Sequence, residues 1–137
     1  MMPLAVTQDE LQNLLFETPF TRSLGYAVKS IADGEAVIGI PFRPESERPG
    51  GIVSGQVYMN AADVAVWLAI KTRLGLDDAS VTLEMKTNFL RPAVRETIEC
   101  RARILQLSRR IVYATAECVN AEGRVLTHHT VTYIRNP

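Results

Sequence analysis

Residues 53–74 have the sequence VSGQVYMNAADVAVWLAIKTRL, and the fold follows from this stretch. Its side chains are apolar on nearly all sides of a helix, which is typical of a helix that lies inside a protein. Gly75 supplies a C-terminal stop, and Lys71 and Arg73 fall in the last turn, where the helix dipole favours cations. Such a helix has to be wrapped by the rest of the chain.

The chain before this helix predicts one short helix and two strands. Thr7 and Glu10 form a capping box with leucines at helical spacing behind it, so a helix is expected over about residues 8–17. From residue 24 to residue 42 apolar and polar residues alternate, with Asp33-Gly34 as the turn between two strands. Residues 43–51 hold two prolines and two glycines with mixed charge, and they are expected to form a loop.

The chain after this helix predicts strands joined by short turns. Apolar and polar residues alternate in four segments: 81–89, 98–104, 112–118 and 125–133. In the first of them the alternation places Val81 and Met85 on one face and Thr82 on the other. Residues 120–123 form a hairpin turn with Gly123 where a positive φ is needed. These short connections predict an antiparallel meander.

Only the strands are available to wrap the apolar helix. The order of elements therefore predicts an α+β fold, in which a strongly curved antiparallel sheet surrounds one long central helix. The chain has 137 residues and no internal repeat or change of composition, so a single domain over residues 1–137 is expected. Exposed edge strands must be hidden or paired, and a dimer that continues the sheet is one way to do so.

The composition excludes several classes of protein. Hydrophobic residues make up 47% and charged residues 22%, which excludes a disordered or collagen-like chain. The 15 basic residues balance the 15 acidic ones, so nucleic acid is not an expected partner. No apolar run approaches the ~20 residues of a membrane-spanning helix, and the first residues lack the regions of a signal peptide. We therefore expect no membrane partner and a cytoplasmic location.

Common catalytic and metal-binding patterns are missing. Ser54 lacks the preceding glycine of a nucleophile elbow, and no glycine-rich nucleotide loop is present. His128 and His129 are adjacent on a predicted strand and should point to opposite faces, which suits a metal poorly. Cys100 and Cys118 are expected to be reduced, buried thiols on neighbouring strands, with a cross-strand disulfide as the alternative.

Two features of the central helix can carry chemistry. Asp63 lies among alanine and valine residues, where an ionised carboxylate is costly unless it is paired or used in a reaction. The alternative is that it faces solvent or pairs with an arginine. The helix begins at Ser54-Gly55-Gln56, and the free N–H groups of a first turn can stabilise an oxyanion. Gly55 lets a substrate approach the backbone, while Ser54 can also be an N-cap.

Gly55 and Asp63 of one copy are too far apart to act on the same atom. They are separated by about 12 Å along a helix axis. A nucleophile and an oxyanion donor both have to lie within about 3 Å of the reacting carbonyl group. If both residues act, two helices must run antiparallel, with Asp63 of one copy near the amino end of the other. Activity would then require a dimer.

Segments 48–63 and 81–92 together resemble the hotdog-fold thioesterases of the phenylacetate-pathway (PaaI-like) family. That family has an Asn-x-x-Gly-x-x-His-Gly-Gly turn, an acidic residue nine positions after the His, and an aromatic-Leu-x-Pro pattern ending a later strand. The positions that match at the same spacing are Gly51, Gly55, Asp63 and Phe89-Leu90-Arg91-Pro92. The resemblance extends in element order from about residue 24 to the C-terminus.

The resemblance implies an acyl-CoA thioesterase with its site between two subunits of a dimer or of a dimer of dimers. Asp63 would be the general base or nucleophile, the Gly55 amide would polarise the thioester carbonyl, and Thr82 would help to orient the attacking water. The family implies no metal and no separate cofactor, since coenzyme A is part of the substrate. The expected substrate-binding residues are Arg48, Ser54, Gln56, Phe89 and Arg91.

Three positions depart from the family pattern. The family Asn falls on Arg48, the His on Ser54 and the second Gly on Gln56. Arg48 cannot accept a hydrogen bond but can hold a CoA phosphate or a substrate carboxylate. Ser54 can donate a hydrogen bond but has no imidazole. These departures leave open a non-catalytic acyl-CoA-binding protein. A hydratase or dehydratase acting on acyl thioesters is a further alternative, although no histidine lies near Asp63 in the motif.

Overall fold

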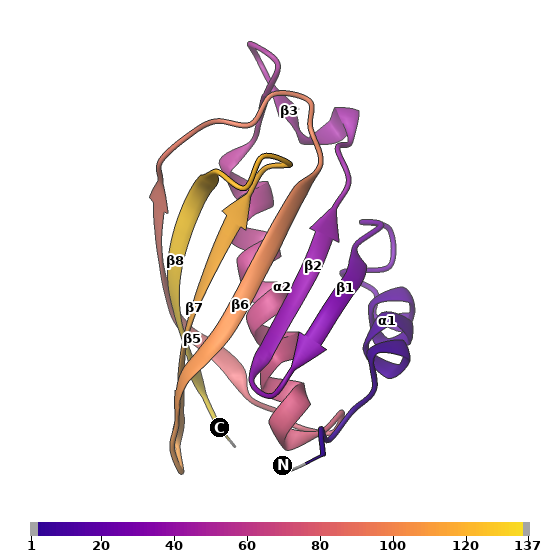
Figure 1. Cartoon of the computed structure of the whole chain (residues 1–137), viewed down its shortest axis with the longest axis vertical. Coiled ribbons are helices and arrows are strands. Elements are labelled where there is room, and N and C mark those ends of the chain that lie inside the picture. The colour runs from indigo at the N-terminus through magenta and orange to yellow at the C-terminus, as the bar shows by residue number, and fades with distance from the viewer. Residues whose placement is uncertain (1–2, 136–137) are drawn as a thin grey trace.

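The computed structural model describes residues 3–135, in which two helices accompany a six-stranded antiparallel sheet (Figure 1). The helices are α1 (Gln8–Glu17) and α2 (Gly55–Leu74). The strands of the sheet are β1 (Ala27–Ala32), β2 (Glu35–Ile40), β5 (Val81–Phe89), β6 (Ile98–Leu107), β7 (Ile111–Val119) and β8 (Val125–Ile134), in the order β1-β2-β6-β7-β8-β5. Neither helix is both long and apolar enough to cross a membrane.

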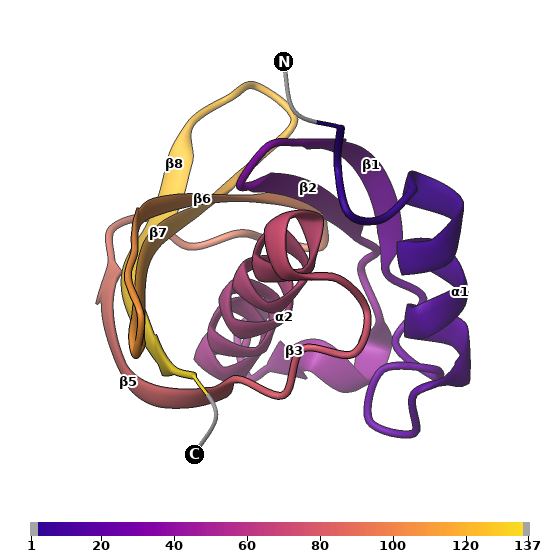
Figure 2. The same ribbon diagram turned by 90° about the horizontal axis from the view of Figure 1, so that it is seen from below.

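The sheet curves around α2, as the view along the helix shows (Figure 2). α1 lies outside this curve, beside β1. The capping box that the sequence predicts for α1 is present, because Thr7 Oγ1 accepts from the Glu10 amide and Glu10 Oε1 accepts from the Thr7 amide. The α+β hotdog architecture, with a curved antiparallel sheet around one central helix, is thereby confirmed.

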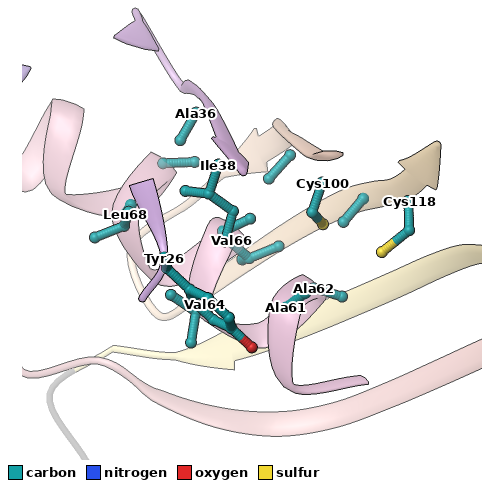
Figure 3. Packing of buried hydrophobic residues seen from close by; sticks show 14 of the residues in the cluster. Tyr26, Ala36, Ile38, Ala61, Ala62, Val64, Val66, Leu68, Cys100 and Cys118 are labelled. Carbon is teal, nitrogen blue, oxygen red and sulfur yellow. The ribbon is translucent and has the colours of Figure 1, made fainter. Parts of the chain in front are cut away.

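Small side chains let α2 pack closely against the concave face of the sheet. Ala61 and Ala62 of the helix are buried, as are Ala36 and Cys100 of the sheet (Figure 3). Cys100 and Cys118 are paired residues of β6 and β7, and both are buried free thiols. The expected reduced pair is therefore confirmed. Close contact between small side chains gives the dense interior that a stable domain requires.

One side of α2 is not covered by the sheet, so the expectation of a helix buried on all sides is wrong. Gln56 and Met59 are exposed, and Asn60, Asp63 and Trp67 are half-buried. These positions recur every three or four residues and form one stripe along the helix. We call them the open stripe of α2. The remaining sides of the helix pack into the hydrophobic core.

The expected four-strand meander is wrong in the placement of β5. Strands β6, β7 and β8 follow one another as hairpins, but β5 pairs with β8, and β6 pairs with β2. The cause lies in residues 90–97, which do not form a hairpin turn. They are tied to a short strand β4 (Ile52–Val53) by the hydrogen bond from the Val53 amide to the Ala93 carbonyl (3.0 Å). The chain thus crosses the end of the sheet and leaves β5 at its edge (Figure 1).

A β-bulge in β5 corrects the expected face of Thr82. Thr82 pairs with Tyr133, but the next paired residue is Glu84, with Thr132, so Leu83 is the extra residue. The bulge shifts the alternation by one position. Thr82 therefore lies on the concave face together with Met85, where strict alternation had placed them on opposite faces.

The segment expected to be a loop contains short regular structure. It holds a 3-10 turn η1 (Pro44–Ser46) and the strand β3 (Glu47–Arg48), which pairs with β4. Gly50 and Gly51 connect the two strands with φ of 98° and 75°. These angles lie in the left-handed region that glycine adopts without a steric penalty. The glycines therefore bring β4 back towards the start of α2.

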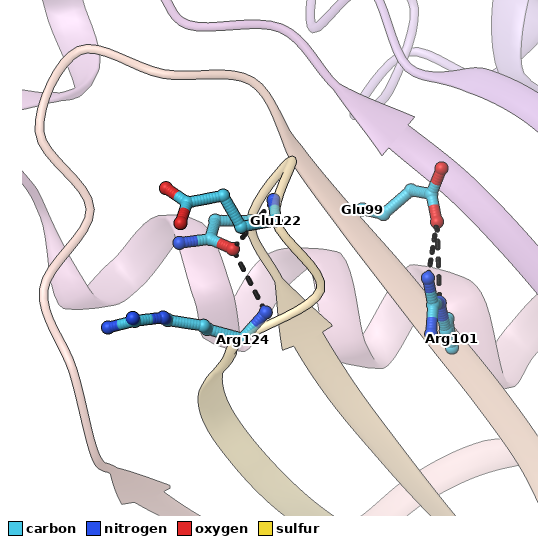
Figure 4. A network of polar contacts seen from close by, with 5 residues as sticks. Glu99, Arg101, Glu122 and Arg124 are labelled. Atoms are coloured by element: carbon cyan, nitrogen blue, oxygen red, sulfur yellow. Dashed lines mark hydrogen bonds and ion pairs between the residues drawn. The ribbon is translucent and has the colours of Figure 1, made fainter.

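The hairpin turn that the sequence predicts at residues 120–123 is present between β7 and β8. Asn120 Oδ1 accepts from the amides of Glu122 and Arg124, both at 3.0 Å, and Gly123 has a φ of 81° (Figure 4). On β6, which pairs with β7, the Arg101 guanidinium donates to the Glu99 carboxylate two residues earlier in the same strand. The turn is closed by local contacts, which explains why the sequence alone predicts it.

The two edges of the sheet differ in how they are covered. Side chains of α1 close the β1 edge: Gln12 Nε2 donates to the Tyr26 carbonyl (3.1 Å), and Gln12 Oε1 accepts from the Val28 amide (2.7 Å). Gln8 Nε2 also donates to the Val28 carbonyl (2.9 Å). Among residues 3–135, nothing covers the β5 edge in this way, and Leu83 of β5 is 58% exposed. Unpaired strand edges bind other strands, so β5 is the edge open to a partner.

We expect replacement of Gln12 by alanine to lower the free energy of unfolding by about 1–3 kcal/mol, because the Val28 amide loses its acceptor. Urea unfolding followed by circular dichroism would measure the change. The matched control is Asn13→Ala, which alters the adjacent exposed position of the same helix. An unfolding free energy that is the same for both variants would show that Gln12 does not close the edge.

Candidate active site

Asp63 is the acid on the open stripe of α2. It is half-buried, and none of the four salt bridges found within residues 3–135 involves it. Pairing of Asp63 with an arginine is therefore wrong for the described part of the chain, whereas the other alternative, a position that faces solvent, is confirmed in part because Asp63 lies on the open stripe. Its carboxylate instead accepts hydrogen bonds from two hydroxyl groups.

Both hydroxyl groups bind the same oxygen of Asp63. Thr82 Oγ1 donates to Asp63 Oδ1 at 2.8 Å, and the Tyr133 hydroxyl donates to the same atom at 2.7 Å. The residues come from α2, β5 and β8. Sequence reasoning identified Asp63 and Thr82 but missed Tyr133, because the pairing of β5 with β8 is not evident from chain order. The single hydroxyl proton of Thr82 is given to Asp63, so its expected contact to a water can only be as an acceptor.

A pocket of about 220 Å³ opens beside this carboxylate. Asp63, Ser80, Thr82 and Tyr133 supply its polar part. Its apolar part includes Phe20 and Trp67, whose rings lie 5.6 Å apart at a tilt of 48°. The pocket thus places a carboxylate beside an aromatic wall.

A second pocket, of about 420 Å³, lies at the amino end of α2. It brings together four of the residues expected from the sequence: Arg48, Gly55, Phe89 and Arg91. Tyr58 also lines it, and its ring meets the Phe89 ring edge-on with centroids 6.2 Å apart. The Tyr58 hydroxyl accepts from the Ala93 amide (3.1 Å), which anchors the segment after β5.

The start of α2 leaves backbone donors without a side-chain cap. Ser54 occupies the N-cap position, but its side chain makes no capping hydrogen bond. The N-cap position expected for Ser54 is therefore confirmed, but without the side-chain hydrogen bond that such a residue can make. A Cβ added to Gly55 would meet Phe89 Cε1 at 3.1 Å, so a larger side chain there would displace the ring. The absence of a side chain keeps the first turn of α2 accessible from the pocket.

Of the expected substrate-binding residues, Ser54 and Gln56 do not line the pocket at the amino end of α2. Gln56 lies at a different pocket. It lines a third pocket of about 150 Å³, together with Tyr26 and Asn60, whose side chains are hydrogen-bonded to each other. Gln56 belongs to the open stripe of α2, while Gly55 faces Phe89. Consecutive helical residues point in directions about 100° apart, which accounts for this separation.

The pocket at the amino end of α2 carries two unpaired cations. Within residues 3–135, neither Arg48 nor Arg91 forms a salt bridge with a carboxylate. Both are exposed at the pocket. A planar guanidinium binds phosphate or carboxylate groups through paired hydrogen bonds. The pocket can therefore receive an anionic group beside an apolar floor.

The histidines and cysteines form no metal site in the described part of the chain. His128 is half-buried and His129 is fully buried, on opposite faces of β8 as expected. Both ring nitrogens of His129 are occupied by Thr87 and Thr127 at 2.8 and 2.7 Å. Nearby, hydrogen bonding to Cys100 is the main influence that lowers the pKa of Cys118, to about 6. These groups belong to the core.

The two parts of the candidate site lie at different places along one helix. The pocket of Gly55 is at the first turn of α2, and the pocket of Asp63 lies about 12 Å further along the axis. No residue lines both pockets. One copy of the described chain thus presents the uncapped first turn of α2 and the Asp63 carboxylate in separate places.

Known proteins are similar to this chain in sequence and in fold. The family described as the thioesterase superfamily matches residues 50–127. A protein of Saccharolobus solfataricus, described as a candidate esterase, is 31% identical over 104 residues, which cover 74% of this chain and 72% of that protein.

Solved structures of a PaaI protein and of a thioesterase are also similar to this chain. A mutant of the phenylacetic acid degradation protein PaaI of Thermus thermophilus is 32% identical with a TM-score of 0.77, covering 86% of this chain and 99% of that one. A hypothetical thioesterase of Streptococcus pneumoniae, solved with coenzyme A, is 18% identical with a TM-score of 0.76 and shares the fold over 95% of this chain and 97% of its own. The resemblance to hotdog thioesterases that the sequence motifs indicate is thereby confirmed, and the chain belongs to the thioesterase superfamily.

Proposed function

We propose that this thioesterase-superfamily hydrolase cleaves acyl-CoA thioesters at a site shared between two copies of the chain. The observation that carries the proposal is the separation of the two pockets along α2. A carboxylate and an oxyanion-binding helix end have to meet one carbonyl group. Two antiparallel copies of α2 would bring Asp63 of one copy to the Gly55 pocket of the other.

The edges of the sheet support a particular dimer. Gln8 and Gln12 close the β1 edge, while the β5 edge is open. Apolar side chains are exposed along and just beyond β5, among them Leu83, Phe89 and Leu90. A two-fold dimer in which β5 pairs with its own copy would continue the sheet and cover these side chains. The same dimer would cover the open stripe of α2.

The charges favour coenzyme A as the leaving group. Arg48 and Arg91 line the pocket of Gly55 and have no carboxylate partner among residues 3–135. They would bind CoA phosphates, while the apolar lining holds the uncharged part of the carrier. The aromatic wall beside Asp63 would hold a small or medium acyl or aryl group. No metal or separate cofactor is needed, and a cytoplasmic location is part of the proposal.

The reaction can follow one of two balanced routes. In the first, Asp63 takes a proton from water while the water oxygen bonds to the carbonyl carbon. In the second, Asp63 itself bonds to that carbon and forms an anhydride, which water then hydrolyses. In both, the Gly55 amide donates to the developing oxyanion and the C–S bond breaks. In the first route the sulfur takes the proton held by Asp63; in the second it leaves as a thiolate, and the water that hydrolyses the anhydride releases the proton that makes it a thiol. The products are a carboxylic acid and coenzyme A.

A heterodimer experiment tests the shared site. Asp63→Asn and Gly55→Val chains are co-expressed with different tags, and the heterodimer is purified. One of its two sites then combines an intact Asp63 with an intact Gly55, so we expect about half the wild-type rate of thiol release, while both homodimers are nearly inactive.

The matched control is the heterodimer of Asp63→Asn with Thr82→Val, both of which alter the same half of the site. Its rate should not exceed the mean of its two parents. A Gly55→Val heterodimer as inactive as its parents would show that one copy holds the whole site. Tight acyl-CoA binding without thiol release by the wild type would instead favour the non-catalytic binding protein, and an absorbance change at an enoyl bond would favour a hydratase.

A further inference from the structure

We propose that Tyr133 is a positioning residue that, together with Thr82, fixes Asp63 Oδ1 and leaves Asp63 Oδ2 as the oxygen that reacts. The inference rests on the proposed function, because it assigns the reacting atom of the same carboxylate. Tyr133 would act only through Asp63, without a chemical step of its own.

The two donors converge on one oxygen from neighbouring strands. Thr82 and Tyr133 are directly paired residues of β5 and β8. Their hydroxyl oxygens lie 2.8 and 2.7 Å from Asp63 Oδ1. The Tyr133 hydroxyl also lies 3.1 Å from the Asp63 carbonyl oxygen, which ties it to the helix backbone as well as to the side chain. The bulge at Leu83 makes this convergence possible, since it turns Thr82 to the concave face.

Tyr133 is held rigidly and stays a donor. Its side chain is buried in the core cluster, with 3% of the residue exposed. Burial, together with the negative charge of Asp63, raises the pKa of the Tyr133 hydroxyl above its ordinary value. The hydroxyl therefore keeps its proton at neutral pH and can act as a hydrogen-bond donor. A buried ring with a fixed hydroxyl is a better anchor than the exposed Thr82 side chain.

The remaining oxygen of Asp63 is the one available for chemistry. Within residues 3–135, no hydrogen bond to Asp63 Oδ2 is formed, whereas Oδ1 accepts two. Asp63 lines the pocket of about 220 Å³ beside Phe20 and Trp67. Rotation about the last bond of an aspartate side chain is soft, so without its donors the carboxylate would turn freely. The two hydroxyl groups thus fix Oδ1 and leave Oδ2 as the oxygen without a hydrogen bond.

This assignment fits either route of the reaction. In the water route, Oδ2 takes the proton as the water oxygen bonds to the carbonyl carbon, and the proton ends on the departing sulfur. In the direct route, Oδ2 forms the bond to the carbonyl carbon and is released when water hydrolyses the anhydride. In both, the protons of Tyr133 and Thr82 stay where they are. Misplacement of the reacting oxygen would slow the reaction without weakening substrate binding.

The test compares kcat and KM for thiol release in Tyr133→Phe, Thr82→Val and the control Tyr113→Phe. Tyr113 is a partly exposed tyrosine of β7. We expect kcat to fall about 10- to 100-fold in Tyr133→Phe, with KM within about twofold of the wild type. Thr82→Val should show the same pattern, and it keeps the test decisive if Tyr133→Phe does not fold. Tyr113→Phe should behave as the wild type.

The same substitution made in an Asp63→Ala protein distinguishes a positioning role of Tyr133 from a structural role. In Asp63→Ala there is no carboxylate to position, so adding Tyr133→Phe should leave the residual rate unchanged. The same fractional loss in both backgrounds would overturn the proposal, as would a kcat of Tyr133→Phe or Thr82→Val within about twofold of the wild type. If the wild type released no thiol, the proposed function itself would fail, and if Asp63→Asn were fully active, the mechanism through Asp63 would fail. If Asp63→Asn is inactive and Tyr133→Phe is not, only the role of Tyr133 fails.

Discussion

Replacement of Asp63 by asparagine is expected to lower the rate of thiol release at least about 100-fold, which is the scale of losing an acid–base group. The amide oxygen of asparagine can still accept the hydrogen bonds of Thr82 and Tyr133, so the fold and the pocket should remain. What the variant lacks is a basic or nucleophilic oxygen at Oδ2. Thiol release from a panel of short, medium, aromatic and hydroxylated acyl-CoAs would measure the loss.

The matched control for this prediction is Asp33→Asn. Asp33 is an exposed aspartate in the turn between β1 and β2, where it pairs with Arg73 at 2.9 Å. Asn-Gly is as suitable for such a turn as Asp-Gly, so the hairpin should be kept. Equal activity of Asp63→Asn and the wild type on every substrate cleaved would remove Asp63 from the reaction, and with it the proposed mechanism.

The parts of the fold that the sequence predicts are those fixed by neighbouring residues. The capping box of Thr7 and Glu10 and the stop of α2 at Gly75 depend on contacts within a few positions. The turn at Gly34 depends on a positive φ, which the sequence indicates by its glycine. The position of β5 depends on residues far apart, because its partner β8 lies at the other end of the chain. Alternation and turn signals carry no information about such a pairing. The expected meander therefore failed at this strand.

The residues of the candidate site show the same difference between what nearby sequence indicates and what distant contacts determine. Asp63 stands out because an acid inside an apolar helix is unusual, and Gly55 because it begins that helix. Tyr133 gives no such signal, since a tyrosine at the end of a strand usually serves packing. The bulge that turns Thr82 inward is likewise invisible in the alternation of β5, where Thr82 and Met85 have opposite parity. The resemblance to a family pointed to Thr82, and the pairing of β5 with β8 explains how it reaches Asp63.

The open β5 edge gives the second large prediction. Leu83 is 58% exposed at the bulge of this edge, and in a two-fold dimer it would be covered in both copies. Covering a leucine contributes about 1.5–3 kcal/mol, and Leu83→Asp would lose this twice. We therefore expect the dissociation constant of the dimer to rise at least about 100-fold. Sedimentation velocity over a range of concentrations would measure the change.

Activity should follow the dimer in this variant, because neither copy alone joins Asp63 to a Gly55 pocket. The specific rate of thiol release by Leu83→Asp should be low in dilute solution and rise with protein concentration, whereas that of the wild type stays constant. The matched control is Leu105→Asp, since Leu105 is 47% exposed and also lies at a bulge, in β6 away from the β5 edge. A Leu83→Asp monomer with the full wild-type rate would show that the site is complete in one copy. The separation of Gly55 from Asp63 along α2 would then have no catalytic meaning, and a substrate would have to be bound and cleaved beside Asp63 alone.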